Sequence, residues 1–244
     1  METYAQIKQS LKKLRLTTIA ETIEHHTKEA IDHQLSYIDY LLLVLQDEID
    51  VRSQKKKDLL IRKSKIGRFK HLVEFDFTAL PGLNKQKILG FTAGNYIESS
   101  ENIIFVGPTG TGKTMLAKAL AYEACCKNYK VIFSRTAKML EDIYAGKADG
   151  SYSKRMESFI KPDLLILDDW GLTVFSNQFL GILNEIISER YENGAIIITS
   201  NRPIDNWDEL FNEPVVSSAL LDRLFHNSHL IKMEGKSYRR RLNL

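Results

Sequence analysis

Cysteine is scarce in this chain of 244 residues, and its scarcity argues against a disulfide-stapled fold. The two cysteines, Cys125 and Cys126, are adjacent, so they form neither a spaced disulfide framework nor a zinc-binding pattern. The six histidines lack carboxylate or cysteine companions at metal spacing, and we therefore expect no zinc. This usage favours a reducing, cytoplasmic setting.

Long apolar runs are also missing. Runs such as Leu41–Leu45 and Ala195–Ile198 are far shorter than the roughly 20 residues that a membrane-spanning helix needs. Residues 1–16 lack the apolar stretch and small-residue site of a secretory signal. We therefore expect no membrane partner, and the 43% of hydrophobic residues can instead form a large core.

Charge is nearly balanced, at a net +3, but it is unevenly distributed. Residues 52–70 hold nine basic residues and one acid, and residues 235–244 hold four basic residues and no acid. The middle of the chain, 71–234, has a net charge of −5. Basic segments that flank such a body indicate a polyanionic partner, although a solvated basic face gives the same pattern.

The pattern of apolar residues changes near residue 70. Residues 1–70 show helical spacing and contain no proline, which predicts an all-α N-terminal domain with the basic run on its last helix. From 71 to 244, short apolar runs alternate with amphipathic segments, which predicts an α/β domain with a parallel sheet covered on both faces. The expected strands are 103–106, 131–134, 164–167, 195–199 and a last one near 229–233.

A glycine-rich loop follows the first expected strand, and a helix follows the loop. This order is the context that the P-loop, or Walker A, pattern requires. Glycines allow backbone N–H groups to approach phosphate oxygens, Lys113 is expected to reach the β and γ phosphates of ATP, and Thr114 to bind Mg²⁺. A glycine-rich turn without a ligand is the alternative. The expected nucleotide-binding residues of this segment are Gly107, Pro108, Thr109, Gly110, Thr111, Gly112, Lys113, Thr114 and Met115.

Two carboxylates, Asp168 and Asp169, end the apolar run 164–167. The carboxyl end of a buried parallel strand can deliver them to the nucleotide. Asp168 is expected to hold Mg²⁺ through water, and Asp169 to orient or deprotonate the attacking water. Asn201 follows the strand at 195–199 and is expected to contact the γ-phosphate and this water. A simple turn is the alternative for both sites.

These motifs resemble the IstB-like ATP-binding proteins, which are AAA+ helper ATPases of bacterial insertion sequences. The chain is also similar to the related DnaC-type replicative helicase loaders. The Asp-Asp-aromatic-Gly ending at 168–171 and the leucine-rich opening favour the first group. The matching segments are 11–16, 75–77, 81–83, 102–107, 165–171, 198–202, 219–223 and 237–239.

The resemblance implies an oligomeric AAA+ ATPase without the usual C-terminal helical lid. It implies that Arg223 reaches the ATP of a neighbouring subunit, where its planar fork matches phosphate charge; a surface salt bridge is the alternative. Arg239 either offers a further arginine to the nucleotide of its own chain or belongs to a solvated tail. The usual AAA+ residue at position 169 is glutamate, so the shorter Asp169 predicts slow hydrolysis or a need for a partner.

The resemblance also implies duplex DNA and a transposase as partners. Contacts to the DNA backbone need basic residues but no reading of sequence. We expect them on the helix at 52–70, whose apolar side includes Ile66, and on a helical insertion at 137–161. The candidate residues are Lys55, Lys56, Lys57, Arg62, Lys63, Lys65, Lys138, Lys147, Lys154 and Arg155.

The sequence therefore predicts an oligomer- and DNA-dependent ATPase that assists a transposase. A second hypothesis is a loading adaptor that binds a replicative helicase through residues 1–70. A small-molecule kinase would share the P-loop, but the sequence supports neither an acceptor pocket nor a lid.

Overall fold

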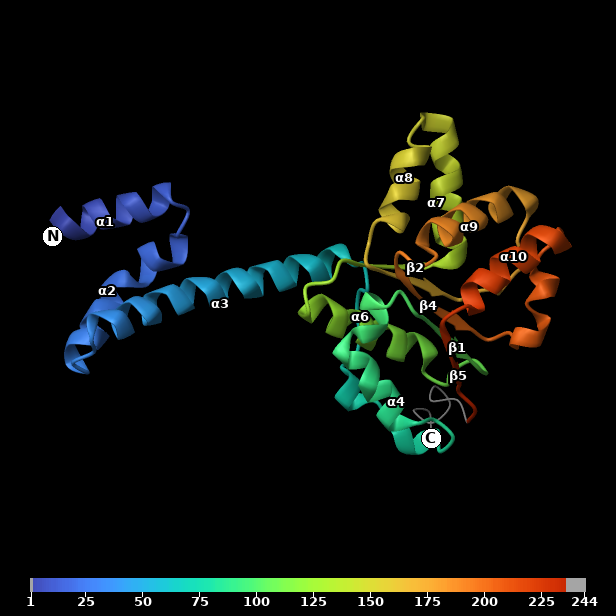
Figure 1. Cartoon of the computed structure of the whole chain (residues 1–244), viewed down its shortest axis with the longest axis horizontal. Coiled ribbons are helices and arrows are strands. Elements are labelled where there is room, and N and C mark those ends of the chain that lie inside the picture. Colours follow the sequence, from blue (N-terminus) through green and yellow to red (C-terminus); the bar gives the residue numbers. More distant parts are fainter. Residues whose placement is uncertain (1, 236–244) are drawn as a thin grey trace. The chain divides into compact units, whose positions relative to one another are not determined.

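The computed structural model describes residues 2–235, which divide between Leu59 and Leu60 into two compact units. The first unit contains helices only (Figure 1). They are α1 (Glu2–Lys13), α2 (Thr17–Asp32) and the greater part of α3 (Tyr37–Lys63). Ile19, Ile23 and Val44 form a small core between α2 and α3.

A buried carboxylate joins α3 to the start of α2. Glu48 accepts a hydrogen bond from the backbone N–H of Ile19 at 3.0 Å and another from Arg52 Nε at 2.6 Å. Leucine occupies the N-cap of α2 and provides no capping side chain. Glu48 therefore satisfies a free N–H group of α2 from the neighbouring helix, and its charge suits the positive end of α2.

Helix α3 ends at Lys63, so the prediction of one helix over 52–70 is wrong in its last part. Lys65 and Gly67 have φ values of 60° and 61°, in the left-handed region, which cannot continue a right-handed helix. Between them, Ile66 is only 1% exposed and lies in the core of the second unit. The division between the two compact units falls between Leu59 and Leu60, whereas a domain boundary near residue 70 stays a prediction from the sequence.

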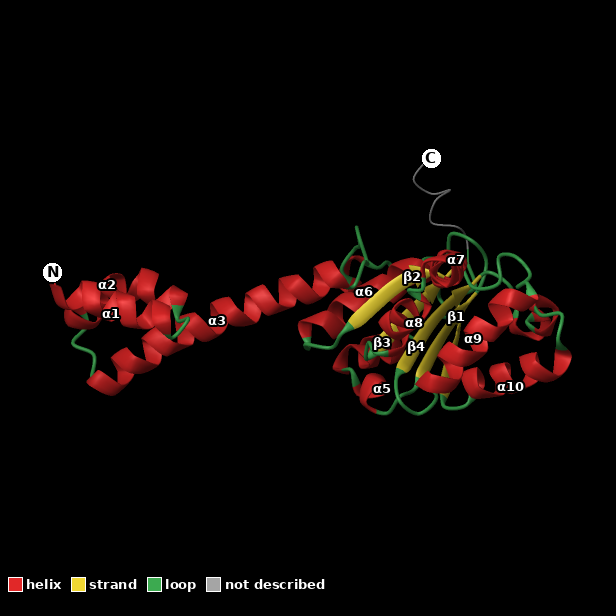
Figure 2. Ribbon diagram, turned by 90° about the horizontal axis from the view of Figure 1, so that it is seen from above, coloured by secondary structure: helices red, strands yellow, loops and turns green. Residues whose placement is uncertain are grey.

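The second unit is built on a five-stranded sheet in which all neighbouring strands are parallel (Figure 2). The spatial order is β2-β3-β4-β1-β5. Every strand expected from the sequence is confirmed, and so is the parallel α/β fold class. The strands are β1 (Asn102–Val106), β2 (Val131–Arg135), β3 (Leu164–Asp168), β4 (Ala195–Ser200) and β5 (Ser228–Lys232).

Helices cover both faces of the sheet, because alternate strand residues point to opposite faces. Ile103 and Phe105 belong to the core that contains α6, whereas Ile104 and Val106 belong to the core that contains α7, α8, α9 and α10. The helices are α4 (Lys85–Gly90), α5 (Asn95–Glu98), α6 (Lys113–Cys126), α7 (Thr136–Asp149), α8 (Tyr152–Ile160), α9 (Asn177–Arg190) and α10 (Pro214–Phe225). Single turns of 3-10 helix occur at Leu72–Glu74, Phe77–Ala79, Phe91–Ala93, Ile204–Asn206 and Asp208–Leu210.

The connections that leave β1 and β4 lie on opposite faces of the sheet, since β1 leads to α6 and β4 leads to α10. Ligands of open α/β sheets bind at the carboxyl ends of strands at such a reversal. The fold therefore predicts a ligand site at the carboxyl ends of β1, β3 and β4. No helix within residues 2–235 is both long and apolar enough to cross a membrane.

Candidate functional site

The loop between β1 and α6 contains three glycines with positive φ, at 155° for Gly107, 87° for Gly110 and 95° for Gly112. Gly112 immediately precedes α6, and no side chain caps this end of the helix. The first N–H groups of an α-helix have no partner within the helix, and the helix dipole adds a positive end. This combination suits a bound phosphate.

Two of these glycines are also required by close packing. A Cβ atom on Gly107 would lie 2.2 Å from the carbonyl oxygen of Met233, which is backbone and cannot turn away. A Cβ atom on Gly112 would lie 2.8 Å from the Phe75 ring. Any larger residue would displace the segments that hold the loop in place.

Lys113 is buried although it is charged, with 8% of its surface exposed. Its ammonium donates hydrogen bonds to the carbonyl oxygens of Gly107 at 2.6 Å and Pro108 at 2.7 Å. Thr111 donates to the same Pro108 carbonyl at 3.0 Å. The lysine charge is thus held inside the loop, where a phosphate group would bind.

Hydroxyl groups from two elements converge on Asp168 at the end of β3. Thr114 Oγ1 donates to Asp168 Oδ1 at 2.7 Å, and Thr199 Oγ1 donates to the same oxygen at 2.6 Å. The Asp168 residue is 4% exposed. Thr114 and Asp168, the two residues expected to bind Mg²⁺, are far apart in the sequence but in direct contact in the structure.

Asp169 turns away from the strand and towards solvent. Its φ is 58°, a left-handed value, and its side chain is 40% exposed. Arg135, at the end of β2, has its Nε atom 3.7 Å from Asp169 Oδ2. Because the arginine side chain is largely exposed as well, solvent screens this ion pair and it contributes little to stability.

A cavity of about 480 Å³ brings these groups together. Its wall combines most of the expected nucleotide-binding residues with Asp169 and Asn201, whereas Gly107 and Pro108 line a neighbouring cavity of about 580 Å³, together with Asn201. The lining residues of the first cavity are Lys70, Thr109, Gly110, Gly112, Lys113, Thr114, Met115, Arg135, Asp169, Leu172, Thr199, Ser200 and Asn201. Lys70, Arg135 and Thr199 were not expected from the sequence.

Arg223 is not part of this cavity. It lies on α10, and its Nη1 atom donates to Asn184 Oδ1 at 3.3 Å. It shares a small cavity with Asn102 and Ile196, which stand at the starts of β1 and β4. A five-residue strand is about 17 Å long, so Arg223 lies roughly that far from the phosphate loop of its own chain.

The basic residues expected to contact DNA lie on α3, directly after it, or on the helical insertion, which is confirmed as α7 and α8. Lys57 is partly buried. Arg239 lies outside the described residues. The candidates with exposed side chains are Lys55, Lys56, Arg62, Lys63, Lys65, Lys138, Lys147 and Lys154.

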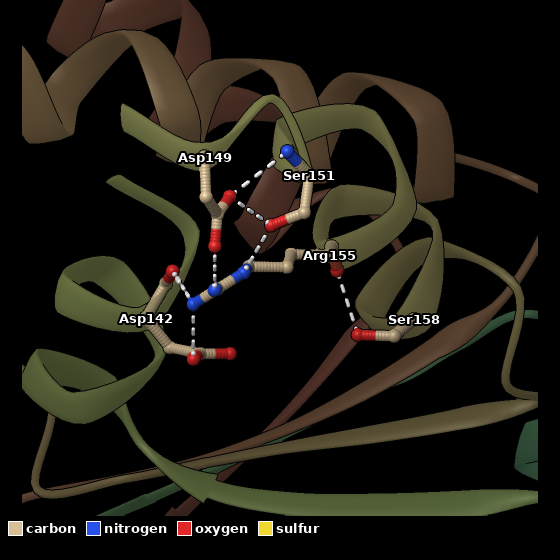
Figure 3. Close-up of polar contacts among 5 residues, drawn as sticks. All are labelled: Asp142, Asp149, Ser151, Arg155 and Ser158. Atoms are coloured by element: carbon tan, nitrogen blue, oxygen red, sulfur yellow. Dashed lines mark hydrogen bonds and ion pairs between the residues drawn. The ribbon is translucent and has the colours of Figure 1, made fainter. Parts of the chain in front are cut away.

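Arg155 differs from these residues because its guanidinium already has partners (Figure 3). It donates to Asp142 Oδ1 at 2.8 Å, to Asp149 Oδ2 at 2.7 Å and to Ser151 Oγ at 2.7 Å. Hydrogen bonds from Ser151, together with the charge of Arg155, hold the pKa of Asp149 below its ordinary value. This network ties α7 to α8 and gives Arg155 a structural role, while its contact with DNA stays a prediction.

Known proteins resemble this chain over nearly all of its length. Residues 9–244 match the family described as IstB-like ATP binding protein. A protein of insertion sequence IS5376 from Geobacillus stearothermophilus is 33% identical over 229 residues, covering 94% of this chain and 91% of that protein. An insertion-sequence protein of Mycobacterium tuberculosis is 34% identical over 236 residues, covering 96% and 94%.

Solved structures share the fold. The DnaI structure has a TM-score of 0.59 and 20% identity, and the match covers 70% of this chain and 93% of that one. AMPPCP-bound DnaA from Aquifex aeolicus has a TM-score of 0.58 and 22% identity, over 73% and 54%. At these identities the likeness establishes the fold alone. Because the family match runs through both compact units, the chain belongs to the family of IstB-like ATP-binding proteins.

Proposed function

We propose that this protein is an Mg²⁺-dependent ATPase that assembles on duplex DNA and assists the transposase of an insertion sequence. The observation that carries the proposal is the convergence of the P-loop, Asp169 and Asn201 on one cavity, with Asp168 in contact with Thr114. The family and its insertion-sequence relatives support this choice among the activities that P-loop proteins perform.

Thr114 and Asp168 are the residues that would hold Mg²⁺. Both supply hard oxygen ligands of the kind that this ion prefers. When bound, Mg²⁺ offsets the negative charge of the β and γ phosphates.

Asp169 and Asn201 would act on the water that attacks the γ-phosphorus. Asp169 accepts a proton from this water as its oxygen bonds to phosphorus, and the bond to the bridging oxygen breaks with its electrons left on ADP. Asn201 orients the water, and Lys113 stabilises the charge on the phosphates. The short side chain of Asp169 leads us to expect slow turnover in the unassembled protein.

Arg223 would complete the site of another copy. It lies near the opposite ends of the strands from its own P-loop, so a contact with a phosphate requires a second chain. Contacts that join two different surfaces of successive copies are heterologous and build rings or helical filaments. Activity of such an assembly rises with protein concentration.

Duplex DNA is the partner that the exposed basic residues favour. Arg62, Lys63 and Lys65 form no salt bridge with any residue in the described range 2–235, so their charges remain available to phosphates. A protein that neutralises several phosphates binds DNA without sequence preference and loses affinity steeply as salt rises. Replacing these three residues with glutamine should lower duplex affinity and reduce the salt slope by about three.

The ATPase rate per subunit, measured against protein concentration with and without duplex DNA, tests the central proposal. We expect the rate to rise with both, and the Lys113→Ala variant to be inactive under every condition. A rate per subunit that is independent of concentration and of DNA would contradict an assembly-dependent ATPase.

The identity of the protein partner needs a separate experiment. Relatives that are 33% and 34% identical come from insertion sequences, so we favour a transposase over a helicase. Immobilised full-length protein with ATP can be offered a transposase from the same insertion sequence and, in parallel, a replicative helicase. Retention of the helicase alone would favour a loading adaptor.

A further inference from the structure

Thr199 occupies the point where β3 and β4 end side by side. Its side chain is buried, with 1% of the residue exposed. The hydroxyl donates to Asp168 Oδ1 at 2.6 Å and accepts the backbone N–H of Asp169 at 3.2 Å. One hydroxyl group therefore contacts both carboxylate residues of the site at once.

The backbone on either side reinforces this connection. The N–H of Trp170 donates to the Thr199 carbonyl at 2.9 Å, and Ser200 Oγ donates to the Trp170 carbonyl at 2.8 Å. Thr136 Oγ1 donates to the Asp168 carbonyl at 3.1 Å. Residues 168–170 are thus held mainly by the end of β4, the strand that also leads to Asn201.

Asp169 needs such support because its backbone is in the left-handed region, with φ at 58°. A residue with a Cβ atom pays a steric penalty there, and the conformation persists only where neighbouring groups maintain it. The Thr199 hydroxyl supplies the acceptor for the N–H group in this turn. Without it the N–H would lose that partner and the turn would lose one of its side-chain restraints.

The Thr199 hydroxyl also helps to fix the orientation of the Asp168 carboxylate. Thr114 and Thr199 both donate to Oδ1, and within residues 2–235 no hydroxyl, amide or cationic group is found to donate to Oδ2. One carboxylate oxygen is therefore fixed by the protein while the other stays available to an ion or its water. A fixed orientation of this kind avoids the entropic cost of ordering the carboxylate during the reaction.

We propose that Thr199 is a positioning residue for ATP hydrolysis, holding the Asp168 carboxylate and the backbone of Asp169 in the geometry that the reaction requires. This proposal rests on the ATPase function proposed above. Thr199 also lines the cavity of the P-loop, but its buried hydroxyl contacts the two aspartate residues, and it acts through them. Its loss should therefore lower kcat and leave nucleotide affinity nearly unchanged.

Three variants of the full-length protein separate this role from a loss of stability. Thr199→Val keeps the shape of the side chain and removes the hydroxyl, whereas Thr199→Ser keeps the hydroxyl. Ile196→Val, at the other end of β4, is the control for a small core defect in the same strand. We expect kcat to fall at least about tenfold in Thr199→Val, with nucleotide Kd within about threefold of wild type, and both values to stay near wild type in the other two.

Amide hydrogen exchange gives a readout that does not depend on turnover. In Thr199→Val the segment 168–170 should exchange faster than in wild type, while Thr199→Ser and Ile196→Val should not differ there. If wild type hydrolyses ATP and Thr199→Val does so equally well, the positioning role is refuted and the ATPase function stands. If wild type does not hydrolyse ATP, the ATPase function fails, and unchanged exchange at 168–170 would also refute the structural restraint.

Discussion

Asp169, which is expected to act on the attacking water, has an unusual backbone conformation. Its side chain lies in the same cavity as the P-loop, and it reaches that cavity because its φ of 58° turns the chain out of β3. We expect Asp169→Asn to keep the turn, since asparagine tolerates left-handed φ, but to remove the proton acceptor. The ATPase kcat should fall by about 10²- to 10⁴-fold with nucleotide affinity retained. Equal loss of binding, measured by nucleotide titration, would instead indicate a structural defect.

Glu48 makes the stability of the helical unit depend on pH. Burial alone would raise the pKa of this carboxyl, but hydrogen bonds from Ile19 N–H and Arg52 and the arginine charge outweigh burial and lower the pKa. A lowered folded-state pKa means that the stabilisation is present above the ordinary value of 4.5 and is lost as pH falls through the lower, folded value. Circular dichroism melting of α-helix should therefore show a loss of stability on the acid side.

The Glu48→Gln variant tests this assignment. It should be less stable than wild type near neutral pH by roughly 1 to 3 kcal/mol, because a charged acceptor is replaced by a neutral amide. Its acid-side decline should be shallower than that of wild type, though not absent, since the pKa of Asp47 is also lowered, by His26. If the stability of Glu48→Gln fell as steeply with acid as that of wild type, a group other than Glu48 would be responsible for the pH dependence.

Some residues of this site follow a recognisable sequence pattern and others do not. The order of strand, loop and helix led to the choice of the P-loop residues, Asp168 and Asn201. The structure places most P-loop residues and Asn201 around one cavity and Asp168 against Thr114, and their roles stay predictions. Thr199 and Arg135 could not be predicted, because their partners lie about 30 residues away in the sequence and meet only when β2, β3 and β4 align. A threonine or an arginine at the end of a strand has no signature of its own.

At the scale of elements, the strands were predictable because each is a short apolar run buried on both faces of the sheet. The end of α3 was not, because Lys65 adopts a left-handed conformation that glycine or asparagine usually signals. The sequence predicts candidate DNA contacts on the insertion α7–α8, and the structure shows that one of them, Arg155, holds its two helices together. Composition alone does not distinguish a structural arginine from one that binds DNA.

A second structural arginine, Arg190, joins three elements at the other end of the sheet. It is 2% exposed and donates to the carbonyl oxygens of residues that end α8, precede β3 and start β4. The acceptors are Phe159, Ile160, Pro162, Asp163 and Ala195. The fork of the guanidinium ties the end of α8 to the segments that begin β3 and β4, and Asp163 O also accepts the backbone N–H of Ala195 at 3.2 Å.

Arg190→Met should therefore destabilise the second unit by at least about 3 kcal/mol, because it removes the hydrogen bonds that the guanidinium donates to these carbonyls. Arg190→Lys should recover part of this loss, since an ammonium offers three donors but cannot match the fork. Thermal melting of the two variants beside wild type measures both effects. Similar melting temperatures for wild type and Arg190→Met would show that the network contributes little.

The separation of Arg223 from the P-loop makes a specific prediction about assembly. A chain with Arg223→Ala keeps its own aspartates but cannot complete a neighbour's site, and a chain with Asp169→Asn keeps the arginine but cannot use its own site. Each variant alone should be nearly inactive. Mixed in equal amounts they should regain activity, because an Asp169→Asn subunit can supply its arginine to an intact site on an Arg223→Ala subunit.

Random mixing would produce such a pairing at roughly a quarter of the heterologous interfaces, which bounds the recovered ATPase rate at about that fraction of wild type. The recovery should disappear on dilution below the concentration at which the wild-type rate per subunit falls. If Arg223 served only as the surface hydrogen-bond donor to Asn184, Arg223→Ala would stay active by itself and mixing would add nothing. The two outcomes are distinguishable in one titration, because only an arginine that acts between chains allows two defective proteins to restore each other.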